Sequence, residues 1–439
     1  MVWWANADCR IESFLPGQSG YLVDRRAFDR RLRRLAAESG AHVRTGIVRK
    51  VEGHEEHEGH EEGREGDHEP GPVNVELEVA LNGERQILRS AFVLDCSGRA
   101  GVIARRGMRE PLPSPRTVAL VGAWRARDRW PEASDAHTLV ASYADGWAWS
   151  VPTEPGLRYF TVMIQPGLTG LADGSAGDRY VTELAKIPPF RKLLDSATPA
   201  GGPWGADASL YTSRTFAGAG FLLVGDAGSF IDPLSSFGVK KALVSGWLAA
   251  ITVHTSLTNA GMRREALQFF DRRERQMAAG SRLQSGQFAA DAAAGTPHPF
   301  WVGRAAVSHD SPGLGDDVDP AALARDPSVL AAFEDLRRRE RVHVMPGSGA
   351  RIEPRPMVRG REIVLEDQLL VPACPDGIRY LRGVDLLELG RLAPQFTDVG
   401  QIYEAQRRAQ PDIALPDFLG ALSVLIAWDV LQHPESARR

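Results

Sequence analysis

The stretch that decides the fold lies at residues 221–250 and reads FLLVGDAGSFIDPLSSFGVKKALVSGWLAA. It opens with four apolar residues, typical of a buried strand, and these are followed at once by Gly225 and Asp226. A proline-containing loop then leads to Gly238, after which apolar residues recur at helical spacing. An aspartate at a strand end can accept hydrogen bonds from polyol hydroxyls, and a helix N-terminus attracts anionic atoms. The pattern therefore indicates either a ligand-binding strand–loop–helix unit or an aspartate-initiated turn that caps a core helix.

Sequence patterns before this stretch predict both helices and strands, which indicates a mixed α/β fold. Asp24 precedes apolar residues at helical spacing and Gly40 follows them, which predicts a helix capped at both ends. Alternation at 73–81 predicts a half-buried strand, and Asn82 with Gly83 predicts a hairpin turn. Several short apolar runs between about 117 and 165 indicate an antiparallel sheet rather than repeated βαβ units.

The composition is that of a globular chain. With 439 residues we expect about two to three domains, and 43% hydrophobic with 25% charged residues excludes a disordered or fibrous protein. The net charge of −4 gives no reason to expect nucleic-acid binding. Residues 52–72 hold nine acids and one arginine, so a short low-complexity segment sets the sign of the whole chain. The segment also contains four histidines, which could suggest a metal site: His54, His57, His60 and His68. We expect instead a solvated insertion without metal, because the segment has no apolar periodicity.

Cysteine usage and hydropathy predict a cytoplasmic protein. The three cysteines are few, odd in number and far apart, which favours a reducing compartment: Cys9, Cys96 and Cys374. The first residues lack the basic and apolar regions of a signal peptide. No apolar run reaches the length of about 18 residues that a membrane-spanning helix needs, so we expect no membrane span.

Four motifs follow one another in a fixed order: GYLVDRRAFD at 20–29, LDCSGRAG at 94–101, GWAWSVP at 146–152 and VGDAGSFIDPLSSFGV at 224–239. They make the sequence similar to FAD-dependent monooxygenases and, more closely, to flavin-dependent halogenases such as the tryptophan halogenases. The motif at 224–239 resembles the second flavin-binding motif of these enzymes. GWAWSVP at 146–152 is similar to the halogenase motif WxWxIP, and LDCSGRAG at 94–101 resembles the third flavin motif. GYLVDRRAFD at 20–29 resembles the strand and helix just downstream of the first flavin elements. The ordered set is more specific than any single match.

The resemblance implies an α/β fold of mixed (α+β) type. It consists of an incomplete FAD-binding domain of the glutathione-reductase type, an antiparallel substrate-domain sheet and a C-terminal helical region. The expected domains are a partial FAD-binding domain (1–115) with the acidic, histidine-rich insertion (52–72), the substrate-domain sheet (116–215), the Gly-Asp motif with long helices (216–293), and a linker with a helical, winged-helix-like region (294–439). Within the last of these we expect 294–320 to be the linker, because it is rich in Pro, Gly and Asp.

The resemblance also implies a cofactor site. In this family the Gly-Asp aspartate contacts the ribityl chain of FAD, and the following helix N-terminus faces the flavin pyrimidine; here these are Asp226 and Gly238-Val239. The FAD-binding residues implied are Arg25, Ser97, Gly98, Gly225, Asp226, Pro233, Gly238 and Val239. The backbone that binds halide in tryptophan halogenases corresponds to Phe237 and Gly238.

Three further side chains are candidate catalytic residues. By resemblance, Trp147 and Trp149 keep flavin and substrate apart, so that a diffusing oxidant travels between them; alternatively, they are core packing, because alternate residues of a strand share one face. Lys240 and its neighbour Lys241 stand in a helix's first turn, where a cation opposes the macrodipole. One of them is expected to meet an anion such as reduced flavin, halide or an acidic substrate, unless it is solvent-exposed or paired with a carboxylate.

The chain departs from the family pattern at three places. No GxGxxG turn precedes the first motif, so the resemblance implies that the chain begins downstream of the pyrophosphate-binding turn. None of the five lysines stands where halogenases carry the lysine that relays hypohalous acid. Ser235 replaces the glutamate of tryptophan halogenases, and SSFG is more similar to phenol or pyrrole halogenases or to non-halogenating monooxygenases.

The function implied is that of an FAD-dependent oxidoreductase that activates O2 and then halogenates or hydroxylates an aromatic or electron-rich small molecule in secondary metabolism. Electrons would come from NAD(P)H or from a separate flavin reductase. Two alternatives stay open at this point: a flavin reductase similar to geranylgeranyl reductase, and a non-catalytic truncated remnant. The sequence predicts no nucleic-acid partner and indicates no particular oligomeric state.

Overall fold

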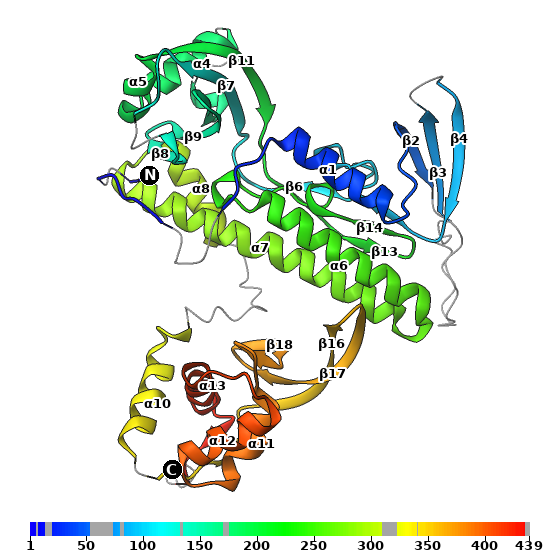
Figure 1. The fold of residues 1–439 in the computed structure, drawn as a ribbon, viewed down its shortest axis with the longest axis vertical. Coiled ribbons are helices and arrows are strands. Elements are labelled where there is room, and N and C mark those ends of the chain that lie inside the picture. Colours follow the sequence, from blue (N-terminus) through cyan, green and yellow to red (C-terminus); the bar gives the residue numbers. More distant parts are fainter. Residues whose placement is uncertain are drawn as a thin grey trace. The chain divides into compact units, whose positions relative to one another are not determined.

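The computed structural model confirms a mixed α/β fold (Figure 1). It describes residues 1–5, 8–13, 20–52, 73–79, 83–131, 135–169, 175–309, 323–339 and 341–434. Residues 53–72, which hold the four histidines of the acidic insertion, and the predicted turn residue Asn82 lie outside these ranges. The chain divides into two compact units: unit 1 comprises residues 1–249 and 277–312, and unit 2 comprises residues 250–276 and 313–439.

A six-stranded sheet forms the centre of unit 1 and confirms the predicted antiparallel sheet. Its order is β1-β8-β9-β10-β7-β11, and every pairing is antiparallel except that of β1 with β8. The strands are β1 (Val2–Trp3), β7 (Val118–Ala126), β8 (Leu139–Tyr143), β9 (Gly146–Glu154), β10 (Leu157–Ile164) and β11 (Ala197–Asp207). Apolar residues on one face pack against α4 (Ala176–Ala185) and α5 (Pro188–Leu194), with Phe160 and Phe190 in edge-to-face contact at 5.4 Å.

A second apolar cluster joins residues of the six-stranded sheet to residues of two helices, α7 (Arg263–Gly295) and α8 (Pro299–His309). Trp4 and Trp301 meet there with ring centroids 5.3 Å apart, and the indole N–H of Trp301 donates to the Tyr143 carbonyl at 2.8 Å. The expectation of a linker throughout 294–320 is therefore wrong for the span of α8. Burial of Phe300 and Trp301 stabilises a helix in a segment whose flanking proline and glycine residues suggested a loop.

A small three-stranded sheet positions the motifs of the decisive stretch. Its order is β13 (Ala217–Gly218), β14 (Phe221–Leu223) and β5 (Val93–Asp95), and β14 pairs with β5 in parallel. The predicted helices follow as α6 (Gly238–Thr258) and α1 (Arg25–Glu38), and the Ala27 N–H donates to the Asp24 carboxylate at 2.6 Å, which confirms the predicted cap. A separate antiparallel sheet contains β2 (Gly46–Glu52), β3 (Val73–Val79) and β4 (Arg85–Ser90).

Unit 2 contains the expected C-terminal helices and a sheet that the sequence analysis did not anticipate. The helices are α10 (Pro327–Arg338), α11 (Leu386–Leu392), α12 (Val399–Ala409) and α13 (Leu415–Ala427). The additional antiparallel sheet is β16 (Arg351–Arg359), β17 (Glu362–Val371) and β18 (Cys374–Ile378). β16 reads RIEPRPMVR and is largely exposed or half-buried, so it lacks the apolar alternation that would predict a strand.

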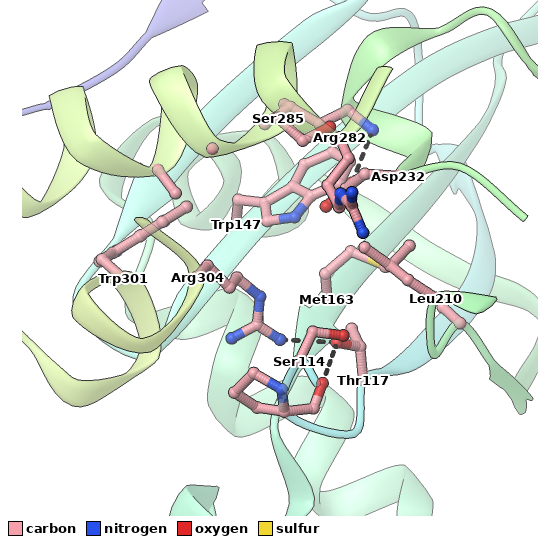
Figure 2. A pocket seen from close by; sticks show the side chains of 15 residues that line it. Ser114, Thr117, Trp147, Met163, Leu210, Asp232, Arg282, Ser285, Trp301 and Arg304 are labelled. Atoms are coloured by element: carbon pink, nitrogen blue, oxygen red, sulfur yellow. Dashed lines mark hydrogen bonds between the residues drawn. The ribbon is translucent and has the colours of Figure 1, made fainter. Parts of the chain in front are cut away.

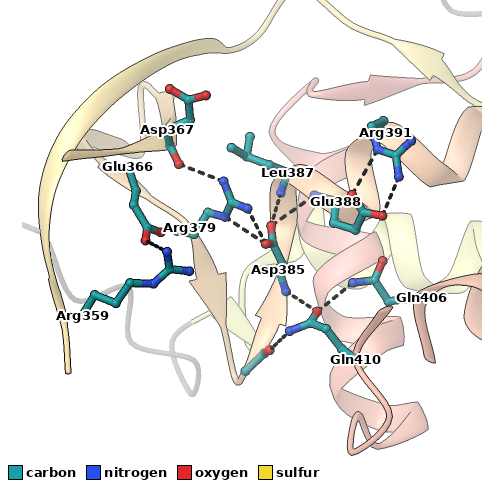
Figure 3. A network of polar contacts seen from close by, with 11 residues as sticks. Arg359, Glu366, Asp367, Arg379, Asp385, Leu387, Glu388, Arg391, Gln406 and Gln410 are labelled. Carbon is teal, nitrogen blue, oxygen red and sulfur yellow. Dashed lines mark hydrogen bonds and ion pairs between the residues drawn. The ribbon is translucent and has the colours of Figure 1, made fainter. Parts of the chain in front are cut away.

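A polar network ties the sheet of unit 2 to its helices (Figure 3). Asp385 caps α11 by accepting from the N–H groups of Leu387 and Glu388 at 3.0 and 3.1 Å. Its second oxygen accepts two hydrogen bonds from the Arg379 guanidinium, at 2.9 and 2.6 Å. The Asp385 N–H donates to Gln410, whose own amide donates to the Gly383 carbonyl. The buried Asp385 therefore holds a strand end and a helix start through its carboxylate, and a neighbouring loop through its backbone N–H.

Short elements complete the fold. The paired short strands are β6 (Arg109–Pro111) with β12 (Tyr211–Ser213), β15 (Met345–Pro346) with β21 (Leu431–Gln432), and β19 (Tyr380–Leu381) with β20 (Val384–Asp385). The single-turn helices are α3 (Pro166–Thr169), η1 (Gly98–Ala100), η3 (Gly225–Ala227), η4 (Pro233–Ser235), η5 (Ala260–Met262) and η6 (Ala393–Gln395). In the part of the chain that the structure describes, no helix combines the length and apolarity needed to cross a membrane.

Candidate functional site

The Gly-Asp turn after β14 is fixed by its backbone conformation and by α6. Gly225 has φ +60°, and a Cβ there would lie only 3.2 Å from the Cβ of Ala242, so this tight approach requires glycine. The Gly225 N–H donates to the Ser245 hydroxyl at 2.9 Å. From the other side, the Tyr211 hydroxyl donates to the Asp226 carbonyl at 2.5 Å. The turn is thus held from two directions.

Asp226 and Lys241 form the charged centre of this turn. The Lys241 side chain is only 1% exposed, and its ammonium nitrogen lies 3.7 Å from Oδ1 of Asp226. The same ammonium donates to the Gly225 carbonyl at 3.0 Å and to the Ser229 carbonyl. Oδ1 of Asp226 is buried and accepts no hydrogen bond from any described residue, although the side chain as a whole is 31% exposed. The exposure of the side chain therefore lies on its other atoms, and a ligand hydroxyl would donate to Oδ2 rather than to Oδ1.

The second motif turn, after β5, lies at the same sheet edge. Leu223 pairs with Asp95 in the parallel ladder, so the turns that follow the two strands leave from neighbouring carboxyl ends. Asp95 holds its turn by accepting from the Ser97 N–H at 3.0 Å, the Ser97 hydroxyl at 2.5 Å and the Ile103 N–H at 2.8 Å. Gly98 has φ +63°, and no atom lies within 4 Å of where its Cβ would be. In open parallel sheets, ligands bind at such an edge.

The N-terminus of α6 is open to solvent. Gly238 begins the helix, and a Cβ there would meet no atom within 4 Å. Phe237 and Val239 on either side are each 41% exposed. Pro233 begins the preceding turn η4, in which the Leu234 N–H donates to the Asp232 carboxylate at 3.0 Å. No acidic residue stands in the first turn of α6, so its free N–H groups and its positive dipole end face outward.

The remaining predicted cofactor and catalytic residues lie in different surroundings. Arg25 is an exposed residue of α1, and its guanidinium pairs with Asp29 at 2.8 Å on the same helix. Lys240 is exposed on α6, with its ammonium 5.1 Å from the centroid of the Phe237 ring. The structure therefore brings together the glycine, serine and aspartate residues of the two turns, whereas Arg25 is engaged on its own helix.

Trp147 and Trp149 share one face of β9 and line part of the cluster against α7 and α8. Figure 2 shows Trp147 at the wall of a cavity of about 30 Å³, with Arg282 and Arg304 reaching toward it from the two helices. Arg304 donates to the Thr117 hydroxyl at 2.6 Å and to the Phe300 carbonyl at 2.9 Å. Space of this volume holds a few waters or one small ion, not an aromatic substrate.

The electrostatics of this cavity are shaped by burial. Burial lowers the pKa of Arg304 to about 10, an effect that the nearby Asp232 charge opposes. Burial also raises the pKa of the Asp232 carboxyl, although the Leu234 N–H and the charge of Arg304 act in the opposite direction. Asp232 therefore links the η4 turn, which leads to α6, to the cavity beside Trp147.

Comparison with known proteins identifies the family to which these elements belong. The family model described as tryptophan halogenase matches residues 14–302, which is more than half of the chain. The chain belongs to this family. It is 32% identical over 206 residues to a tryptophan 2-halogenase of Chondromyces crocatus, covering 46% of this chain and 40% of that protein. It is 27% identical over 275 residues to the flavin-dependent halogenase armH3 of Armillaria mellea, covering 58% of this chain and 52% of that protein.

Solved structures share the fold of this family member. CmlS, a flavin-dependent halogenase, has a TM-score of 0.68 at 19% identity, with 93% of this chain and 77% of that chain covered. The peptidyl tryptophan dihydroxylase QhpG has a TM-score of 0.59 at 22% identity, with 97% and 83% covered. At these identities the likeness concerns the fold alone. The chain spans about half or less of the length of the curated halogenases named above.

The residues present at the two turns fit a flavin dinucleotide. The Asp226 side chain is 31% exposed although its Oδ1 is buried against Lys241, so Oδ2 remains as an acceptor for a ribityl hydroxyl. The absent side chains at Gly98 and Gly238 leave open space where a ring system could approach the backbone. The described residues contain no group of three His, Cys, Asp or Glu side chains that could hold a metal ion.

Sequence reasoning missed two residues of this region and left a third undecided. It names Lys241 together with Lys240, and nothing in the sequence shows which of the two is buried. Asp232 stands inside the quoted motif, and its place before a proline is itself a signal for a turn cap. Arg304 lies in a segment that reads as a linker, so no local pattern could have placed it beside Trp147.

Proposed function

We propose that this chain is an FAD-dependent oxidoreductase of the halogenase and monooxygenase type, acting on an aromatic or otherwise electron-rich small molecule. The observation that carries the proposal is the partly exposed Asp226 carboxylate, paired with the buried Lys241, beside the open N-terminus of α6 in a member of the tryptophan halogenase family. An acceptor for a polyol and a positive helix end for an electron-rich ring are what a flavin requires.

Residues of both turns would contribute contacts to the cofactor. Asp226 accepts from a ribityl hydroxyl, while Gly225 and Gly98 let the backbone approach closely. The N–H groups at Gly238 and Val239 stabilise negative charge on the flavin pyrimidine. Ser97 and Pro233 shape the flanking turns. When bound, FAD supplies the electrons that activate O2.

The residues around the helix start and the tryptophan pair would complete the site. The backbone at Phe237 and Gly238 binds halide, because free N–H groups at a helix N-terminus attract anions. Trp147 and Trp149 separate the flavin from the substrate, and Lys240 is the exposed cation nearest the helix start that can meet an anion or the oxidant. Arg25 would contribute to the cofactor only by leaving its ion pair with Asp29.

Partners and compartment follow from this chemistry. A separate flavin reductase or NAD(P)H would supply electrons, and the product would belong to secondary metabolism. None of the three cysteines forms a disulfide with a described residue, which fits the reducing cytoplasm. The proposed reaction is either halogenation or hydroxylation of the substrate, because Ser235 stands where tryptophan halogenases carry glutamate.

The test combines a flavin spectrum with product analysis. The purified chain is mixed with FAD, NADH and a flavin reductase, and then with phenols, pyrroles and indoles in the presence of chloride or bromide. We expect a yellow protein and a product whose isotope pattern shows incorporated halogen, or a hydroxylated product when halide is irrelevant. A reduced product formed without O2 would support a flavin reductase similar to geranylgeranyl reductase instead. A colourless, inactive protein would support a non-catalytic remnant and overturn the proposal.

A further inference from the structure

A lysine is buried beneath the Gly-Asp turn, and the proposed chemistry does not use it. Lys241 lies one helical turn into α6, with a side chain that is 1% exposed. Lysines are almost never fully buried unless they are paired, and a cation in the first turn of a helix opposes the macrodipole. Its position is therefore unfavourable on both counts, and the surrounding contacts must stabilise it.

Three of these contacts belong to the turn that carries Asp226. The ammonium donates to the carbonyl of Gly225, which precedes this aspartate, and to the carbonyl of Ser229, three residues after it. The same nitrogen lies 3.7 Å from Oδ1 of Asp226, close enough for strong attraction at low dielectric. One side chain thus holds both ends of the turn and faces the carboxylate between them.

We propose that Lys241 is a positioning residue for FAD, which holds the buried Oδ1 of the Asp226 carboxylate and balances its charge, so that Oδ2 is left for the cofactor before FAD binds. This inference rests on the FAD site of the proposed function. It deepens that proposal by assigning a role to a side chain that never touches the substrate.

The physical reason is preorganisation. A carboxylate oxygen that is buried without a hydrogen bond is costly, and a nearby ammonium offsets that cost without occupying the lone pairs that a ribityl hydroxyl needs. The two carbonyl contacts remove the freedom of the turn, so less entropy is lost when the cofactor binds. A neutral apolar side chain in place of Lys241 would remove this donor from both carbonyls and leave the charge of the Asp226 carboxylate unbalanced. The Gly225 carbonyl would keep only the N–H groups of Gly228 and Ser229, at 3.2 and 3.3 Å.

The first experiment measures FAD affinity by quenching of flavin fluorescence in the full chain. The variants are Lys241→Met, Asp226→Asn and the double variant, with Lys192→Met, an exposed lysine on α5, as the matched control for loss of one charge. We expect each single variant at the turn to weaken FAD binding at least tenfold. Because Lys241 acts through Asp226, the double variant should bind within threefold of the weaker single variant. Lys192→Met should bind as the wild type does.

The second measurement is the midpoint potential of the bound flavin at saturating FAD. Lys241→Met leaves a negative charge uncompensated near the flavin and should shift the potential to more negative values. Asp226→Asn should shift it in the opposite direction, and the double variant should return toward the wild type. A residue that only supports the fold would not give shifts of opposite sign, so this pattern separates positioning from general stability.

Clear outcomes would overturn the inference. If Lys241→Met is folded and keeps the affinity and potential of the wild type, the lysine has no role toward FAD. If the effects of the two single variants multiply in the double variant, Lys241 does not act through Asp226. Should Lys241→Met fail to fold, Lys241→Arg and Lys241→Gln replace it, and equal affinities for these two would contradict a role of the charge. A wild type that binds no FAD would overturn the proposed function as well, whereas FAD binding without product formation would leave this inference standing.

Discussion

The indole rings of Trp147 and Trp149 stack on one face of β9, with their centroids 4.9 Å apart and their planes at 26°. Trp147 is 3% exposed and belongs to the cluster formed with α7 and α8, while Trp149 packs at the edge of that cluster. The two tryptophans thus pack in the core, which is one of the two roles that the sequence suggested for them. The role of the pair as a barrier between flavin and substrate stays a prediction.

We expect Trp147→Ala to lower the free energy of unfolding by about 3–5 kcal/mol, because it removes a fully buried aromatic side chain and leaves a cavity. Trp149→Ala, at a half-buried position, should cost clearly less. Urea unfolding followed by circular dichroism measures both values. A loss below about 1 kcal/mol for Trp147→Ala would show that the cluster does not depend on this ring.

Replacing Lys240 by Gln should lower product formation about tenfold or more and leave FAD affinity within threefold of the wild type. The reason is that Lys240 is exposed at the start of α6 and, unlike Lys241, has no contact with the Gly-Asp turn among the hydrogen bonds described above. Steady-state product analysis with flavin titration separates the two effects. Unchanged product formation would remove Lys240 from the candidate catalytic residues.

The stability of the Asp232→Asn variant relative to the wild type should depend on pH. Burial raises the pKa of the Asp232 carboxyl above 3.8, so the folded state binds its proton more tightly than the unfolded chain does. Wild-type stability is therefore lost as the pH rises from 3.8 through the folded pKa. Asparagine retains the cap but does not titrate. The free energy of unfolding of Asp232→Asn should therefore rise relative to that of the wild type as the pH rises across that window.

Asp326→Asn provides a control of opposite sign for this measurement. The hydrogen bond from the Ser328 hydroxyl lowers the pKa of Asp326, which caps α10. The stabilisation by the Asp326 carboxylate is present above pH 3.8 and is lost as the pH falls. The free energy of unfolding of Asp326→Asn should therefore fall relative to that of the wild type as the pH rises. Chemical unfolding between pH 3 and 7 measures both differences. A difference for Asp232→Asn that is the same at every pH would contradict the expectation.

In unit 2, Asp385→Ala should lower the free energy of unfolding by about 2–4 kcal/mol. The change removes a helix cap, which contributes about 0.5–2 kcal/mol, and leaves the Arg379 guanidinium without its main acceptor. Glu404→Ala, which breaks an exposed pair with Arg407, should stay within about 0.5 kcal/mol of the wild type. Equal effects of the two substitutions in denaturant unfolding would show that the network of Figure 3 adds little.

Local patterns predicted those elements whose signals lie close together in the chain. The Asp24 cap, the α6 helix and the antiparallel strands depend on neighbouring residues, and the structure confirms each of them. The sheet β16-β17-β18 was missed because its first strand is arginine- and proline-rich and little buried. The helix α8 was missed because two buried aromatic residues stabilise it inside a stretch of loop-forming residues.

The sequence by itself determined the order of the flavin motifs and the residue types at the turns, because glycine, aspartate and a helix start impose their conformations locally. Only the tertiary structure decided which of two adjacent lysines is buried. Residues 240 and 241 differ by one step of about 100° around α6, and the position of the Gly-Asp turn against that helix selects Lys241. Only the tertiary structure could likewise bring Arg304 beside Trp147, since long-range packing joins residues that no local pattern connects.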